Sequence, residues 1–510
     1  MAGIFAILTQ KKLGRFDRKK IKKQASKIKH RGLLHTFNFN KFPLDLIFHQ
    51  KKAFKNNYPL NFSLSEDNND LIVIDGQIYN LDELNSQYNN SKDNVKSSNL
   101  NLECLIEGYR EFGPRIFTQT LGSYSGVLYI NNELICFKDP IGAKPLYYCE
   151  NEDYFVVSSE LKALTYLNKD IIPIPPGYII SSSGKKRKFF QFPNFVKKYK
   201  LSTKLVKKLQ SKLNTLIKKA ITDNIRNGEE IGLLFRGGIE SVIIAYVAKD
   251  LAPNLKVYTV GTEDSKDFLF SKKFAKIYYL DHSIVKISFK DILDVLPKVI
   301  YALETYDAAL IRSAIPMFII SKYIKDNSNI DVLLTGEGGN ELFGGYKYFE
   351  DLDTPNSFNQ ELLNLINIEY KTGLQRLDRI PYYFSIETRA PLFDRRLVEF
   401  SLSIPPKLKI FKNKYGKANK WILRKAFEEE IPKQFIWRKK QKFSEGVETQ
   451  YLLHNYIEDT ISNEEFEKQK QISSSIKIRS KEELFYWRIF ESKFNLTEKT
   501  LLQIRVTNNF

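Results

Sequence analysis

The sequence contains little cysteine, which excludes several ways of holding a protein together. Only Cys104, Cys136 and Cys149 occur among 510 residues, and their spacing matches neither a disulfide framework nor a zinc site. Long apolar runs are also missing, because no stretch approaches the roughly 18 uninterrupted apolar residues of a membrane helix. The sequence therefore predicts a cytoplasmic protein of a reducing compartment, without a membrane association.

The pattern of a signal peptide is missing as well. The first nine residues are apolar, but no basic segment precedes them and charged residues follow. They predict a strand over Ile4–Thr9 instead.

Acidic residues are outnumbered, with 59 Asp and Glu against 79 Lys and Arg, for a net charge of +20. Such an excess would suit a nucleic-acid partner. The basic residues are nevertheless spread along the whole chain, including Lys11–Lys29, Lys185–Lys188 and Lys439–Lys442, and no motif of a nucleic-acid-binding module is present. We therefore favour solvated basic surfaces over nucleic-acid binding.

Hydrophobic residues make up 43% of the chain, enough for two or three domains with separate cores. Residues 1–190 alternate short strand patterns with turns, and the Pro-rich stretch Ile172–Gly177 and the basic run near Lys185 mark the boundary. Residues 205–500 open with helical apolar spacing and then alternate strand and helix patterns. This alternation predicts an α/β domain built on a parallel sheet with crossover helices.

Individual elements are also predicted by their patterns. In the first domain we expect a basic helix over Lys11–His30, a strand over Leu71–Ile74, a helix over Leu102–Phe112, and a hairpin from Tyr124 to Phe137 that turns at Asn131-Asn132. In the second we expect a helix from Leu205, strands at Gly232, Val257–Val260 and Ser283–Ile287, helices over Phe270–Tyr279 and Ile292–Ala308, and a mostly helical region after Tyr346.

Two glycine-rich loops stand out in the second domain. Gly232-Leu-Leu-Phe-Arg-Gly-Gly-Ile-Glu-Ser241 and Asp331-Val-Leu-Leu-Thr-Gly-Glu-Gly-Gly-Asn-Glu-Leu-Phe-Gly-Gly-Tyr346 each run from an apolar strand into a glycine turn. Glycine lets the backbone approach a ligand closely, and loops at strand ends of open α/β sheets bind ligands. The pair predicts a nucleotide phosphate site.

These motifs resemble those of the glutamine-dependent asparagine synthetases. Further matching stretches are Glu304–Arg312, Glu387–Asp394 and Trp437–Gly446, and the likeness covers nearly the whole chain. The resemblance implies an N-terminal class II glutamine amidotransferase sandwich of antiparallel sheets and a C-terminal adenine nucleotide α-hydrolase-like fold. It also implies the family reaction, in which ATP with Mg²⁺ activates L-aspartate as β-aspartyl-AMP and ammonia completes L-asparagine.

The glutamine pocket departs from the family pattern. Landmarks such as His30-Arg-Gly32 are kept, but Ala2 stands where the family has its nucleophilic cysteine, and a methyl group cannot attack an amide. A carboxylate at Asp75 would repel the oxyanion that the family's asparagine stabilises. The resemblance places these two residues in one degenerate pocket with Lys51, Gly76, Gln77 and Asn101. We therefore predict that glutamine hydrolysis is lost.

The synthetase site departs from the family as well. Arg236 replaces a serine, Glu240 carries one methylene more than the family's aspartate, and Asn340 replaces a carboxylate, so Glu240 and Asn340 predict only a weak metal site. By resemblance, catalysis is assigned to Glu337 and Lys440, and aspartate binding to Glu337 and Arg312. The remaining nucleotide-site positions are Leu234, Gly237, Gly238, Ser241, Val260, Thr335 and Gly336.

Four further family positions leave their role open. Arg376 and Asp378 match a paired motif, and Arg389 and Asp394 match a motif of the helical core beside Glu387. A structural network of ion pairs explains them as well as direct catalysis does.

Several functions remain open at this point. The sequence favours an asparagine synthetase-like protein that has lost glutaminase activity and has an impaired synthetase, which makes it pseudoenzyme-like. Its substrates, if it is active, are ATP, aspartate and ammonia. The alternatives are an active ammonia-dependent asparagine synthetase, an amide-forming enzyme like a β-lactam synthetase, and a non-enzymatic basic scaffold. A homodimer, or a dimer with a paralogue, is a possible assembly.

Overall fold

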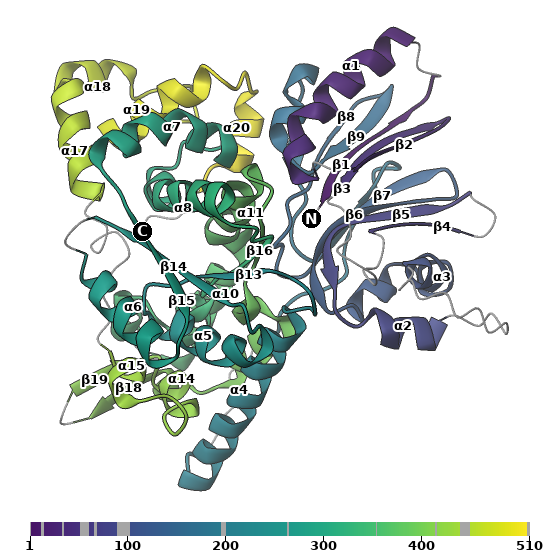
Figure 1. Cartoon of the computed structure of the whole chain (residues 1–510). Coiled ribbons are helices and arrows are strands. Elements are labelled where there is room, and N and C mark those ends of the chain that lie inside the picture. Colours follow the sequence, from purple (N-terminus) through teal and green to yellow (C-terminus); the bar gives the residue numbers. More distant parts are fainter. Residues whose placement is uncertain are drawn as a thin grey trace.

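The computed structural model describes residues 2–11, 15–32, 35–50, 61–65, 69–88, 102–194, 200–262, 265–352, 354–413, 416–438 and 449–506. Two lobes lie side by side in Figure 1, an N-terminal lobe of sheets in purple and blue and a C-terminal lobe of helices around a sheet in teal, green and yellow. In the part of the chain so described, no helix combines the length and apolar character needed to cross a membrane.

The N-terminal lobe is built on two six-stranded antiparallel sheets, as predicted. The first sheet has the order β10 (Ile172–Pro173), β8 (Tyr147–Glu150), β9 (Tyr154–Ser158), β1 (Ala2–Thr9), β3 (Leu44–Gln50), β2 (His35–Lys41). The second has the order β12 (Lys186–Lys188), β11 (Tyr178–Ser181), β7 (Glu133–Lys138), β6 (Gly122–Ile130), β5 (Leu71–Ile78), β4 (Phe62–Leu64). Because alternate residues of a strand point to opposite faces, Ala2, Ile4 and Ala6 of β1 share one core with Leu71 and Val73 of β5.

Helices flank these sheets (Figure 1). The predicted basic helix is α1 (Arg15–Ala25), followed by a 3₁₀ segment, Ser26–Arg31, that carries His30 and Arg31 toward the C-terminal lobe. The others are α2 (Leu81–Tyr88) and α3 (Glu103–Phe112). The predicted hairpin is confirmed, because Asn131 and Asn132 both have positive φ angles, 51° and 62°, as a tight turn between twisted strands requires.

The C-terminal lobe contains the predicted parallel sheet. Its order is β15 (Asp281–Lys286), β14 (Lys256–Gly261), β13 (Ile231–Leu234), β16 (Val332–Leu334), β17 (Glu387–Arg389). The two glycine loops follow β13 and β16, which are neighbours, so both loops emerge at the same edge of the sheet. From β13 the chain first adds β14 and β15 on one side of this strand and later adds β16 and β17 on its other side. The strand order therefore reverses between β13 and β16, and open α/β sheets bind ligands at such a switch point.

The helices of this lobe cover the sheet and extend beyond it (Figure 1). Those up to the second loop are α4 (Thr203–Asp223), α5 (Ile239–Leu251), α6 (Lys266–Ile277), α7 (Phe289–Leu303), α8 (Ala308–Asn327) and α9 (Gly339–Phe343). The mostly helical region after Tyr346 is confirmed and comprises α10 (Pro355–Ile368), α11 (Gly373–Tyr383), α12 (Arg395–Ser403), α13 (Pro406–Lys409), the hairpin β18 (Ile410–Asn413) and β19 (Gly416–Asn419), α14 (Trp421–Ala426), α15 (Lys433–Ile436), α17 (Thr449–Thr460), α18 (Asn463–Gln469), α19 (Lys481–Glu491) and α20 (Glu498–Ile504).

Two details differ from the expectations. The helix predicted over Ile292–Ala308 is two helices, because Glu304 adopts a left-handed conformation (φ 60°) that ends α7 and the Asp307 side chain caps α8. The motif assigned to the helical core is a strand at Glu387–Arg389, because this segment pairs with β16 and completes the edge of the sheet.

Lys409 carries a buried amino group, and we expect its replacement by methionine to stabilise the protein. The side chain is fully buried at the end of α13, and its Nζ has no hydrogen-bond partner among the described residues. Burial lowers the pKa of Lys409 well below 10.5. Lys409→Met keeps the volume and removes an unpaired buried polar group, which should raise the free energy of unfolding by about 1–3 kcal/mol at neutral pH.

The pH dependence provides the check on Lys409. Because the pKa of this lysine is lowered in the folded state, the unfolded chain binds more protons, and the wild-type protein should gain stability as pH rises toward 10.5. Lys409→Met should reduce this slope in urea unfolding at pH 7 and pH 9. Lys407→Met, at an exposed position of the same helix, is the control and should change little. Loss of stability in Lys409→Met would contradict the argument.

Candidate functional site

The position of the family nucleophile lies deep in the N-terminal lobe. Ala2 opens β1 and is fully buried, and its backbone N–H donates to Asp75 Oδ1 at 2.8 Å. Arg31 donates through Nη2 to Asp75 Oδ2 (2.6 Å) and through Nε to the Ala2 carbonyl (3.1 Å). The structure thus brings Ala2 and Asp75 together as predicted, and the Asp75 carboxylate is already engaged on both oxygens.

The other predicted pocket residues are divided. Gly76 has φ 105° and lies against the Ser123 carbonyl, so any side chain there would collide with β6. Gln77 reaches across the lobe boundary, where its Nε2 donates to Glu387 Oε1 at 3.0 Å. Lys51 and Asn101 lie outside the described residues.

Arg31 also connects the two lobes. Its guanidinium donates to Glu160 Oε1 at 2.9 Å and to both carboxylate oxygens of Asp378, on α11, at 2.6 and 3.0 Å. Burial alone would lower the pKa of Arg31, but the carboxylates of Asp378, Asp75 and Glu160 raise it well above its usual value. One fully buried cation therefore holds three carboxylates from both lobes.

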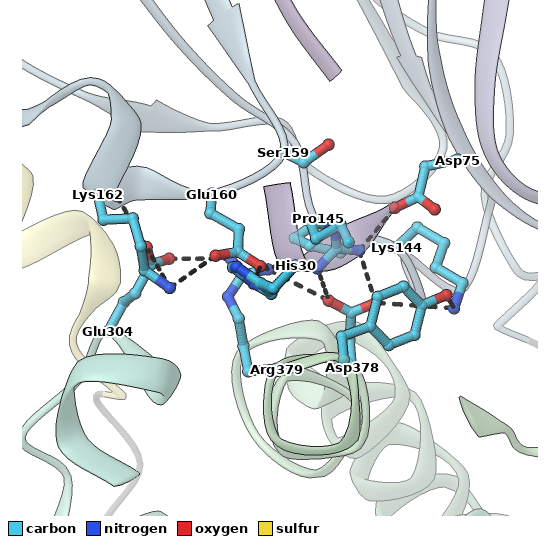
Figure 2. Close-up of polar contacts among 12 residues, drawn as sticks. His30, Asp75, Lys144, Pro145, Ser159, Glu160, Lys162, Glu304, Asp378 and Arg379 are labelled. Atoms are coloured by element: carbon cyan, nitrogen blue, oxygen red, sulfur yellow. Dashed lines mark hydrogen bonds and ion pairs between the residues drawn. The ribbon is translucent and has the colours of Figure 1, made fainter. Parts of the chain in front are cut away.

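A second arginine extends this network, which Figure 2 shows between the lobes. Arg379 contacts Glu304 at 3.1 Å and Asp378 at 3.2 Å, and Lys162 donates to Glu160 at 2.6 Å. The pKa of Glu160 falls well below its usual range, because His30, Lys162 and Arg379 outweigh the effect of burial. We call the set Arg31, Asp75, Glu160, Lys162, Glu304, Asp378 and Arg379 the interface network.

The four family positions whose role was open have different surroundings. Asp378 belongs to the interface network, and Asp394 caps α12 and pairs with Arg396 at 2.6 Å. Arg389 donates to Glu229 and Glu387. These three residues are therefore parts of structural ion pairs. Arg376 differs, because it bridges Ser313 Oγ (2.7 Å) and the loop residue Glu337.

The first glycine loop is held from outside by an arginine. Gly237 has φ 75°, and Arg438 donates to the carbonyls of Arg236 (2.9 Å) and Gly237 (3.2 Å) and to Asp267 (2.6 Å). Gly238 is the N-cap of α5 and has no side chain to bond the first turn of that helix. A helix N-terminus beside the guanidinium of Arg438 is suited to an anion.

Arg236 brings a partly buried positive charge to this loop. Burial lowers the pKa of Arg236, while Asp267, Glu240 and Glu337 act in the opposite direction. The Arg236 guanidinium therefore interacts electrostatically with Glu240 of the first loop and Glu337 of the second. Ser241, which the sequence assigned to phosphate binding, donates its hydroxyl to the Gly238 carbonyl at 3.0 Å.

The second loop carries a buried acidic group. Glu341 is 1% exposed and accepts from Tyr346 Oη, and its Oε2 has no hydrogen-bond partner among the described residues. Burial and the neighbouring Glu337 raise the pKa of Glu341, and burial together with Glu341 raises that of Glu369 well above normal. Two carboxyl groups at this point, Glu341 in the loop and Glu369 outside it, therefore have raised pKa values.

Other predicted residues are placed as follows. Thr335 is buried, and its hydroxyl lacks a hydrogen-bond partner within the described ranges. Val260, the residue before the last of β14, is also buried. Arg312 pairs with Glu482 of α19 at 2.7 Å, which engages the guanidinium that the resemblance assigned to aspartate. Lys440 lies outside the described residues.

The two loops meet at Glu240. Its carboxylate pairs with Lys420, which follows the hairpin β18–β19 and is 4% exposed. A Cβ at Gly339 would lie 2.8 Å from Glu240 Cδ, and one at Gly336 would lie 2.9 Å from Glu240 Cβ. Glycine at both positions therefore makes room for the longer acidic side chain.

Comparison with known proteins identifies the family. The asparagine synthase model matches residues 212–370 and 350–499, and the glutamine amidotransferase domain model matches residues 1–173. The chain belongs to the asparagine synthetase family.

Relatives of this asparagine synthetase homologue extend over most of its length. The nodule asparagine synthetase (glutamine-hydrolyzing) of Pisum sativum is 30% identical over 473 residues, which covers 88% of this chain and 78% of the relative. Asparagine synthetase (glutamine-hydrolyzing) 1 of Arabidopsis thaliana is 28% identical over 519 residues, covering 97% and 87%. Among solved structures, the glutamine phosphoribosylpyrophosphate (PRPP) amidotransferase from B. subtilis is 13% identical to this chain. The match covers 56% of this chain and 91% of the solved chain, with a TM-score of 0.32.

The magnesium ion implied for an asparagine synthetase does not fit these loops. Mg²⁺ prefers charged oxygen ligands in octahedral geometry. Here Glu240 is already paired with Lys420, and Asn340 carries no charge. Among the described residues, no group of three or more His, Cys, Asp or Glu side chains is arranged to hold a metal ion. The predicted weak metal site is therefore not supported by the geometry.

Three contributors to these sites in the asparagine synthetase homologue were missed by sequence reasoning. Arg31 lies within the His30-Arg-Gly32 landmark and Arg438 within the Trp437–Gly446 stretch, so both belong to family motifs, but the motifs assigned them no role. Lys420 stood in no motif, and no signal in the sequence singled it out. Its partner Glu240 is 180 residues away in the chain.

Proposed function

We propose that this protein is an asparagine synthetase homologue that has lost glutamine hydrolysis and retains a nucleotide site with impaired or no synthesis of asparagine. The proposed domains are residues 1–190, with a glutaminase-like fold, and residues 205–500, with the ATP-binding synthetase-like fold. The ligands would be ATP and, if synthesis persists, L-aspartate and ammonia.

One observation carries the loss of glutamine hydrolysis. The residue at the nucleophile position is Ala2, and its backbone N–H is bound to the Asp75 carboxylate, which Arg31 holds from the other side. No thiol or hydroxyl replaces the missing nucleophile at this position, and a fixed carboxylate next to it opposes the negative charge of a tetrahedral intermediate. This supports a pocket that no longer releases ammonia from glutamine.

The loops of the second domain support nucleotide binding more than turnover. Arg236, Arg438 and the uncapped N-terminus of α5 provide positive charge for phosphate groups. Catalysis of adenylation also needs compensation of the charge on the leaving pyrophosphate, which Mg²⁺ normally supplies. Because Glu240 and Asn340 do not form a magnesium site, we infer that adenylation is slow or absent.

The test is release of pyrophosphate from ATP and Mg²⁺ in the presence of L-aspartate. Ammonium in excess and glutamine are supplied in separate reactions, and asparagine is quantified alongside. We expect no glutamine-dependent release, and ammonium-dependent release that is weak or undetectable. ATP should raise the thermal unfolding temperature in either case. Glutamine-dependent asparagine formation at rates typical of enzymes would refute the proposal.

A second candidate is an active ammonia-dependent asparagine synthetase. It is favoured by the ion pair between Arg376 and Glu337, because this pair fixes the position of the carboxylate that the resemblance assigns to catalysis. Robust release of pyrophosphate with ammonium but not with glutamine would select this alternative. If ATP neither reacts nor stabilises the protein, a scaffold role with a homodimer or a paralogue partner becomes the better account.

A further inference from the structure

Lys420 lies between the two glycine loops and has a left-handed backbone conformation. It follows β19 with φ 57° and serves as the N-cap of α14, so the chain turns sharply at this residue. The left-handed conformation is costly for a lysine and persists only where surrounding contacts hold it. Its side chain is 5% exposed and pairs with the Glu240 carboxylate of the first loop.

The same side chain also touches the second loop. A Cβ at Gly345 would collide with Lys420 Cε and with Asn340 Oδ1, and it would lie 2.8 Å from Asn340 Cα. The Lys420 side chain therefore lies close to both Asn340 and Gly345, and only glycine fits at position 345. Its ammonium lies between residues 240 and 340, the two positions from which the sequence predicted a metal site.

The acidic residue at this point already has a cationic partner. Lys420 pairs with Glu240, and Asn340 adds no negative charge, so a divalent cation would have to displace a lysine to reach the Glu240 carboxylate. An ammonium group has three donors, of which the ion pair with Glu240 uses one. The remaining donors and the charge suit phosphate oxygens, as do the positive charges of Arg236 and Arg438 at the first loop.

We propose that Lys420 takes the place of a divalent cation in this protein, and that the site binds the polyphosphate of a nucleotide without Mg²⁺. The inference rests on the proposed nucleotide site and adds to it that ATP needs no Mg²⁺ to bind, because the Lys420 ammonium supplies the positive charge. Gly339 and Gly345 complete the arrangement, because any larger residue would push Glu240 or Lys420 out of place.

The experiment compares ATP binding to the full chain in EDTA and in Mg²⁺ by titration calorimetry. For the wild-type protein we expect dissociation constants that agree within about threefold between the two conditions. Lys420→Met should weaken binding in EDTA by about 10- to 100-fold, the usual effect of losing a hydrogen-bonded charge. Lys417→Met, on the exposed hairpin strand β19 next to it, is the matched control and should bind as the wild type does.

A second variant tests the idea with Lys420 intact. Asn340→Asp restores the carboxylate, so binding in EDTA should fall about tenfold and Mg²⁺ should recover it. Wild-type binding that requires Mg²⁺, or unchanged affinity in both Lys420→Met and Asn340→Asp, would overturn this inference while leaving the proposed function in place. No binding of ATP in either condition would overturn the nucleotide site itself, and with it both proposals.

Discussion

Replacing Arg31 by methionine should lower the free energy of unfolding by about 3–5 kcal/mol, the usual cost of removing one partner from a buried ion pair. Arg31 is fully buried and is hydrogen-bonded to Asp75, Glu160 and Asp378. Without it, these carboxylates lose their central counter-ion in a region closed to water. Urea unfolding at pH 7.5 measures the effect.

The pH dependence separates this charge effect from simple loss of packing. In the wild-type protein Asp378 and Glu160 have lowered pKa values, so their contribution is present above about pH 4 and is lost as pH falls below it. In Arg31→Met the same carboxylates lose their counter-ion, so their pKa values rise and the folded variant takes up protons. The deficit relative to wild type should therefore shrink between pH 7.5 and pH 5.

The control for Arg31 is Arg115, an exposed arginine of the 3₁₀ segment Gly113–Thr118. Arg115→Met should change the free energy of unfolding by less than about 0.5 kcal/mol. A deficit in Arg31→Met that is small, or that is independent of pH, would mean that Asp75, Glu160 and Asp378 are stabilised by other groups.

Ala2→Cys should not restore glutamine hydrolysis. Loss of a catalytic nucleophile costs about 10⁶-fold in rate in a serine protease, and a cysteine at this position would supply the missing atom. The Asp75 carboxylate would still lie beside residue 2, because it accepts a hydrogen bond from the backbone N–H of that residue at 2.8 Å. The negative charge of Asp75 stands where the family has an oxyanion-stabilising asparagine, so it should lower the rate of glutamine hydrolysis by at least about 10²–10³-fold.

Glutamate release from glutamine measures the effect, and mass spectrometry first establishes whether Met1 has been removed to expose the thiol and its amine. The double variant Ala2→Cys with Asp75→Asn should exceed Ala2→Cys by about 10²–10³-fold if the carboxylate is the main obstacle. Efficient hydrolysis by Ala2→Cys alone would show that Asp75 does not oppose the reaction.

The sequence by itself determined the elements and their class. A short continuous apolar run predicted β1, whose residues are buried on both faces, and helical spacing predicted α4, which buries one face. The Asn131-Asn132 turn and the two glycine loops were also predicted, since positive φ angles and close backbone approach are local properties of residue type. The family motifs then identified the two folds.

Only the tertiary structure decided which charges meet. Arg31 and Asp378 are 347 residues apart, and Glu240 and Lys420 are 180 apart, so no local pattern predicted either pair. Glu387–Arg389 became a strand rather than part of the helical core, because pairing with β16 outweighed its helical neighbours. Local propensities act over a few residues, whereas buried ion pairs join segments that only the packing of the folded chain brings together, because removing one partner of such a pair is costly.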